Sequence, residues 1–168
     1  LILAQIAFEI ICFDDGSKSK LNAENEKINS LENARFKVLE NNIGRSAIRN
    51  LLAKEATYKW LLFLDADVLP TNNQFINNYI ACFNTSKTVF CGGLLYQHKK
   101  ENLNLLRYKY GKKHEEISIE KRLENPSKYF FTSNFFPTFE KLAIKKSNVF
   151  YFNCMKVCYV CFLKSRNE

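Results

Sequence analysis

Short apolar runs alternate with more polar segments along the first part of the chain. The apolar runs predict strands at residues 9–13, 36–39, 60–64 and 88–91. The polar segments predict helices at residues 20–33, 46–56 and 73–83. The run WLLFL at 60–64 is unbroken, which is typical of a strand that is covered on both faces. This alternation predicts an α/β domain with a mostly parallel sheet flanked by helices.

The composition is that of a folded domain. The chain has 168 residues, of which 46% are hydrophobic, so it can bury a core, and this composition disfavours intrinsic disorder. The net charge of +8 permits an anionic partner, but the basic residues are dispersed and form no recognisable nucleic-acid motif. We expect no nucleic-acid partner; a basic nucleic-acid-binding module remains an alternative that a salt series in a binding assay would expose.

Two acidic turns stand where predicted strands end. Asp14 and Asp15 follow the first strand, and Asp65 and Asp67 follow the third. Ligands bind at the carboxyl ends of strands in such sheets. Paired carboxylates repel one another there unless a hard divalent cation offsets their charge, and Mg²⁺ or Mn²⁺ prefers carboxylate and phosphate oxygens. The pattern indicates a metal and a phosphorylated ligand, with an ordinary acidic turn as the alternative.

The segments EIICFDDGS, NIGRSAIRN and WLLFLDADVLP, in this order, resemble the family 2 glycosyltransferases with the GT-A fold. The resemblance runs over residues 9–139. It implies a Rossmann-like sheet flanked by helices. It also implies transfer of a sugar from a nucleotide-sugar donor, with a UDP-sugar expected, to an acceptor hydroxyl in the synthesis of a polysaccharide or glycolipid.

The resemblance assigns roles to individual residues. It implies that Asp14 and Asp15 hold the uracil and ribose, and that Arg49 lies near the nucleotide. It makes Asp67 the direct ligand of Mn²⁺ or Mg²⁺ and places Asp65 nearer the ribose, as the second carboxylate of the metal pair. We expect Asp15 to lie in an exposed turn. The loop around the donor sugar and acceptor is expected to contain Gly92, Gly93, Ser133 and Asn134.

The ends of the chain depart from the family pattern. The chain begins in what we interpret as the helix after the family's first strand, so we expect an incomplete sheet with an empty central place. The stretch after Asn148 has no acidic pair to deprotonate the acceptor, so the general base is unidentified. We therefore expect a partial GT-A domain at 1–148, with weak or no transferase activity, and an atypical tail at 149–168. A shifted or prematurely ended reading frame would explain that tail.

The sequence also bears on alternative functions of the protein and on its cellular location. A nucleotide-sugar-binding pseudoenzyme is an open alternative, whereas zinc binding by the tail is disfavoured because Cys154, Cys158 and Cys161 have no neighbouring fourth ligand. With no secretory leader and no spanning segment in the sequence, the expected location is the cytoplasm. Peripheral association with the inner face of the cell membrane stays open.

Overall fold

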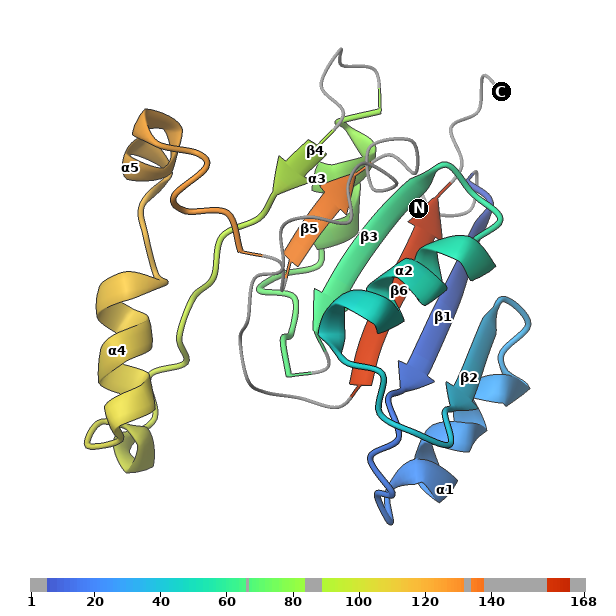
Figure 1. The fold of residues 1–168 in the computed structure, drawn as a ribbon. Helices are drawn as coiled ribbons and strands as arrows, with labels where there is room; N and C mark the ends of the chain where they lie inside the picture. Colours follow the sequence, from blue (N-terminus) through green and yellow to red (C-terminus); the bar gives the residue numbers. More distant parts are fainter. Residues whose placement is uncertain (1–5, 66, 84–88, 132–133, 138–156, 164–168) are drawn as a thin grey trace.

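The computed structural model describes residues 6–65, 67–83, 89–131, 134–137 and 157–163. A six-stranded sheet with the strand order β2-β1-β6-β3-β5-β4 lies at its centre (Figure 1). The strands are β1 (Phe8–Asp14), β2 (Ala34–Val38), β3 (Trp60–Asp65), β4 (Val89–Cys91), β5 (Asn134–Pro137) and β6 (Val157–Leu163). The helices are α1 (Asn22–Asn25), α2 (Arg45–Glu55), α3 (Phe75–Ile80), α4 (Leu106–His114) and α5 (Ile119–Glu124), with short 3-10 helices η2 (Glu26–Ser30) and η3 (Lys100–Asn102).

The first four strands all run in the same direction. β1 pairs with β2 in parallel, whereas β6 is antiparallel to both β1 and β3. β5 is antiparallel to both β3 and β4. The prediction of a mostly parallel sheet is therefore wrong for the pairings: among the described strands only β1 and β2 pair in parallel. The reason is that β5 and β6, which run the other way, stand between strands that share a direction.

The middle of the sheet is filled by β6. Its backbone pairs with β1 from Val157 opposite Asp14 to Leu163 opposite Phe8, and it pairs with β3 along its other edge. The expectation that the central place stands empty is wrong. β6 supplies hydrogen-bonding partners to both neighbouring strands, as buried backbone groups require.

Helix α2 covers one face of the sheet (Figure 1). Leu61 and Phe63 of β3 point to this face, and the Phe63 ring stacks on Phe135 of β5 with 4.8 Å between ring centroids. The buried cluster on this side consists of Ile11, Phe13, Ile48, Leu52, Ala53, Leu61, Phe63 and Phe135. Because side chains alternate along a strand, the neighbours of Leu61 and Phe63 must be covered from the other side.

Helix α3 helps to provide that second cover. Trp60 and Leu62 of β3 pack in a cluster with Tyr79 of α3 and Phe136 of β5, and the rings of Trp60 and Phe136 stack at 4.9 Å. The interpretation of 60–64 as a strand covered on both faces is confirmed. Burial on two faces explains why that run contains no polar residue.

The predicted elements up to residue 91 exist, with shifted bounds. The expected helix at 20–33 is split into α1 and η2, and the expected helix at 73–83 is the shorter α3. Helices α4 and α5 were not predicted; they project from the sheet beyond the edge strand β4 (Figure 1). Within the part of the chain that the structure describes, no helix has the length and apolar character needed to cross a membrane.

Candidate functional site

The carboxyl ends of β1 and β3 lie at the same edge of the sheet because the two strands share a direction. The first residues of β6 lie between them, with Val157 opposite Asp14 and Cys158 opposite Asp65. Two strand spacings of about 4.8 Å each put the ends of β1 and β3 roughly 10 Å apart. β5 begins at this edge too, since Asn134 pairs with Leu64. This edge, called the carboxyl edge below, therefore gathers both acidic turns.

The Asp14 carboxylate stabilises the turn that follows β1. Its side chain is fully buried and accepts hydrogen bonds from the backbone N–H of Ser17, at 2.5 Å, and from the Ser17 hydroxyl. Gly16 in this turn has φ +67°, and a Cβ atom there would lie 2.6 Å from the carbonyl carbon of Asn41. The turn therefore requires glycine at this position, and the Asp14 carboxylate provides the acceptor for a backbone N–H of the turn.

Asp15 joins the turn after β1 to the loop before α2. Its carboxylate accepts hydrogen bonds from the backbone N–H groups of Ile43 at 2.7 Å and Gly44 at 2.9 Å, and its carbonyl accepts one from the side-chain amide of Asn42. Only 5% of Asp15 is exposed, so the expectation of an exposed turn is wrong. The physical reason is that Gly44 immediately precedes α2, and N–H groups at a helix start lack partners inside the helix and attract a carboxylate.

Arg49 and Asp65 form an ion pair between α2 and the end of β3. Arg49 Nη2 lies 2.6 Å from Asp65 Oδ1, and the two side chains are 11% and 14% exposed. Burial raises the pKa of Asp65 above its usual value, and the Asp67 carboxylate adds to the rise, while Arg49 and Arg45 oppose it. Asp65 thus lies close enough to Asp67 to feel its charge, and its own charge is balanced by arginine.

Asp67 is exposed beyond the end of β3, and it is the one of the two carboxylates that faces solvent. A divalent cation fits this donor set, because Mg²⁺ and Mn²⁺ bind proteins through one or two carboxylates and complete their shell with phosphate and water oxygens. Across the described ranges, no group of three or more His, Cys, Asp or Glu side chains could hold a metal by itself. Asp67, with Asp65 beside it, would hold such an ion together with a ligand.

Gly92 and Asn134 meet at the same edge. The Gly92 N–H donates to the Asn134 carbonyl at 3.0 Å, and the Asn134 side-chain carbonyl accepts from the buried Tyr79 hydroxyl at 2.5 Å. Burial raises the pKa of Tyr79, which keeps it protonated as a donor. A Cβ atom on Gly92 would lie 2.1 Å from Asn134 Nδ2, so this contact requires glycine. Gly93 lies beside it, with its carbonyl 3.4 Å from Asn134 Nδ2.

The structure thus brings three groups of predicted site residues to the carboxyl edge: those around the end of β1, those around the end of β3, and those after β4 and at the start of β5. Ser133 lies outside the described residues. Sequence reasoning missed two neighbours of Gly92 and Gly93: Tyr79, and Arg122 of α5, which donates to the Cys91 carbonyl at 3.3 Å. Tyr79 sits in an apolar helical pattern and Arg122 in a charged one, so neither carries a local signal for this position.

Comparisons with known proteins show which family the chain belongs to. The sequence profile of the family described as Glycosyl transferase family 2 matches residues 2–154, and this stretch contains every site residue named above, while β6 lies beyond it. Neither a curated protein nor a solved structure matches the chain. Since the matched stretch makes up most of the 168 residues, the chain belongs to the family 2 glycosyltransferases.

Proposed function

We propose that the carboxyl edge binds a nucleotide sugar, with a UDP-sugar as the expected donor, for transfer of the sugar to a hydroxyl of a glycan or glycolipid. Family membership supports glycosyl transfer in general. The observation that carries the finer proposal is the pairing of an exposed carboxylate, Asp67, with a neighbour, Asp65, whose charge arginine balances. Such a pair can receive a cation together with a diphosphate.

Different residues of the carboxyl edge have different roles in the proposed binding. Arg45 and Arg49 place positive charge next to Asp65, which favours the approach of a diphosphate. Asp15 fixes the loop before α2, and Gly92 keeps the backbone free of a side chain where it packs on Asn134. When bound, Mn²⁺ or Mg²⁺ supplies positive charge that offsets the charge developing on the diphosphate leaving group.

Transfer also requires a base for the acceptor hydroxyl. Among the carboxylates of the two acidic turns, Asp14 and Asp15 are buried and accept hydrogen bonds, and Asp65 is ion-paired. The exposed Asp67 is the proposed metal ligand. A nucleotide-sugar-binding protein with weak or no turnover is therefore the second candidate function, and it shares the same binding site.

Calorimetry with UDP, with and without Mn²⁺, tests the binding site. We expect Asp67→Ala to weaken metal-dependent UDP binding by at least about tenfold, since a diphosphate beside two carboxylates is repelled without a cation. Glu32→Ala is the matched control: Glu32 is exposed and precedes β2 at the opposite edge of the sheet, so affinity should not change. Equal affinity of Asp67→Ala and the parent protein would contradict the assignment.

Release of UDP from a panel of UDP-sugars separates the two candidates. Metal-dependent release at about 1 s⁻¹ or faster, a rate usual for enzymes, would establish transfer or hydrolysis. Binding of UDP without such release would select the non-catalytic candidate.

A further inference from the structure

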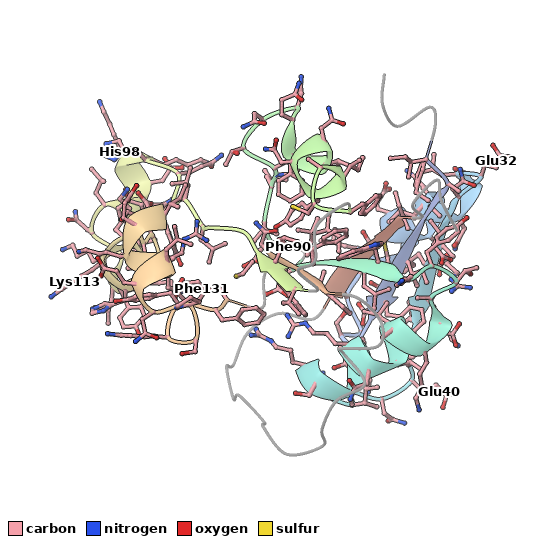
Figure 2. All side chains as sticks on the ribbon, turned by 90° about the horizontal axis from the view of Figure 1, so that it is seen from above. Glu32, Glu40, Phe90, His98, Lys113 and Phe131 are labelled. Carbon is pink, nitrogen blue, oxygen red and sulfur yellow. The ribbon has the colours of Figure 1, made fainter. Side chains whose placement is uncertain are left out.

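A projecting segment exposes large apolar side chains to solvent. The segment, called the arm below, comprises residues 95–130 with α4 and α5, and it stands apart from the sheet (Figures 1 and 2). Seven of the thirteen large apolar side chains that are exposed in the described part of the chain belong to it. They are Leu95, Leu105, Leu106, Tyr110, Ile119, Leu123 and Phe130.

The helices of the arm each expose an apolar pair at a spacing of four residues. In α4 the pair is Leu106 and Tyr110, which are 83% and 51% exposed. In α5 it is Ile119 and Leu123, which are 61% and 73% exposed. Residues four apart lie on the same side of a helix, so each helix presents an apolar stripe to solvent.

Both helices are also held by contacts with other parts of the chain. Gly111 of α4 is buried against Tyr96, such that a Cβ atom there would lie 2.1 Å from the Tyr96 ring. Arg122 of α5 turns toward β4 and donates to the Cys91 carbonyl. A rotation of either helix would break these contacts, so each helix is fixed in an orientation that leaves its apolar pair exposed.

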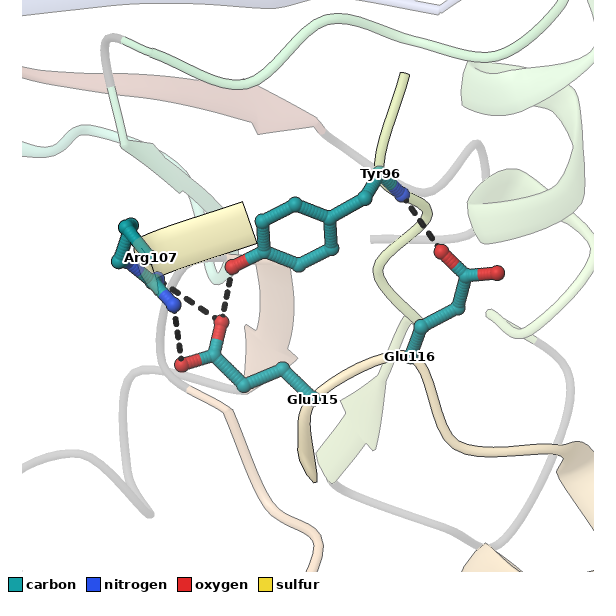
Figure 3. Close-up of polar contacts among 4 residues, drawn as sticks. All are labelled: Tyr96, Arg107, Glu115 and Glu116. Carbon is teal, nitrogen blue, oxygen red and sulfur yellow. Dashed lines mark hydrogen bonds and ion pairs between the residues drawn. The ribbon is translucent and has the colours of Figure 1, made fainter. Parts of the chain in front are cut away.

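A polar network fixes the shape of the arm (Figure 3). Arg107 donates two hydrogen bonds to Glu115, at 3.0 and 2.9 Å, and the Tyr96 hydroxyl donates to the same carboxylate. The Tyr96 backbone N–H donates to Glu116 at 2.8 Å, and Lys112 pairs with Glu116 as well. Two of the acidic residues of the arm are thus engaged within it.

Basic residues surround the apolar stripes. The arm has nine Lys and Arg against five Asp and Glu, a net charge of +4 and half of the net charge of the whole chain. Lys109 and Lys113 lie on the same side of α4 as Leu106 and Tyr110, and both are exposed. A surface that combines exposed leucine, isoleucine and tyrosine with lysine suits the boundary of an anionic bilayer, where apolar side chains enter and lysines meet the headgroups.

We propose that the arm is a docking surface for an anionic lipid bilayer. The projecting position lets the arm meet a flat surface without the sheet intervening, and the net charge of +4 complements anionic headgroups. The arm contains none of the four aspartates Asp14, Asp15, Asp65 and Asp67 of the carboxyl edge, so variants of its exposed leucines leave those residues unchanged.

Cosedimentation of the full chain with vesicles tests the docking. We expect binding to phosphatidylcholine vesicles that contain phosphatidylglycerol, little binding to phosphatidylcholine alone, and weaker binding at high salt. Leu106→Ser with Leu123→Ser should weaken binding at least about tenfold, because two apolar side chains no longer enter the bilayer. The matched control is Leu21→Ser with Leu31→Ser, two leucines that are 67% and 58% exposed outside the arm, and it should bind as the parent does.

A charge pair of variants completes the test. Lys109→Gln with Lys113→Gln should weaken binding to anionic vesicles more than Lys20→Gln with Lys54→Gln, whose side chains are also exposed. Circular dichroism checks that each variant is folded. Absence of binding to anionic vesicles, equal losses in the arm and control variants, or a dimer in solution that the leucine variants of the arm dissociate would each overturn the proposal.

Discussion

The ion pair between Arg49 and Asp65 allows a quantitative prediction about the free energy of unfolding. Arg49→Met keeps most of the apolar stem but removes the cation, and it leaves the Asp65 carboxylate in a site where its side chain is 14% exposed. Breaking a fully buried pair costs about 3–5 kcal/mol, whereas an exposed pair contributes about 0–1 kcal/mol. Because this pair keeps some contact with water, we expect a loss of about 2–3 kcal/mol in the free energy of unfolding at neutral pH.

The cost should depend on pH in a definite direction. Burial already holds the pKa of Asp65 above its usual value, so the ionised carboxylate destabilises the folded chain above that pKa. Removing Arg49 raises the pKa further and enlarges this penalty. As the pH falls through the raised pKa, Asp65 takes up a proton and no longer needs a cation. The difference between variant and parent should therefore shrink toward about pH 4, near the pKa of an unfolded Asp.

Urea unfolding at neutral and acidic pH measures this difference, and a surface pair serves as the control. Lys27 and Glu24 are also 2.6 Å apart, but their side chains are 72% and 68% exposed. Lys27→Met should therefore change stability by less than about 1 kcal/mol. If Arg49→Met cost no more than Lys27→Met, or cost the same at both pH values, the reasoning from burial would be refuted. Asp65→Asn added to Arg49→Met should recover part of the loss.

Further predictions concern the backbone around the site. Asp15→Asn should lower the free energy of unfolding by about 1–3 kcal/mol in urea, because an amide cannot accept from both N–H groups that the carboxylate holds. Gly92→Ala should lower the melting temperature clearly more than Gly93→Ala, since the added methyl meets packed atoms at Gly92 and the movable end of an arginine at Gly93. Val160→Pro should abolish cooperative unfolding by circular dichroism or cost about 3 kcal/mol or more, because it places a proline in the central strand.

The order of elements up to residue 91 could be predicted because it depends on local patterns. Each apolar run is long enough for one strand, and the turn residues between runs mark where it stops. The shared direction of β1 and β3 followed from the helical segments between them. This shared direction is what brings Asp14, Asp15, Asp65 and Asp67 to one edge, so the location of the candidate site was within reach of the sequence.

The hydrogen-bond and ion-pair partners of the site residues could not be predicted from the sequence, because they depend on tertiary contacts. No local pattern shows that Asp15 would accept from Ile43 and Gly44, or that Arg49 would pair with Asp65. The same holds for Tyr79, whose hydroxyl meets a side chain 55 positions away in the chain. A motif names the chemical groups of a site, while burial and pairing decide which of them remain open to a ligand.

The position of β6 shows how far the site depends on contacts distant in sequence. β1 and β3 do not pair with each other; each pairs with β6, so β6 sets the distance between the turn at Asp15 and the carboxylates at Asp65 and Asp67. The family profile ends at residue 154, before β6 begins. The motifs of the family thus supply the functional groups of the edge, whereas a strand outside the matched stretch holds the two halves in register. Nucleotide binding and folding should accordingly fail together when the backbone pairing of β6 is broken.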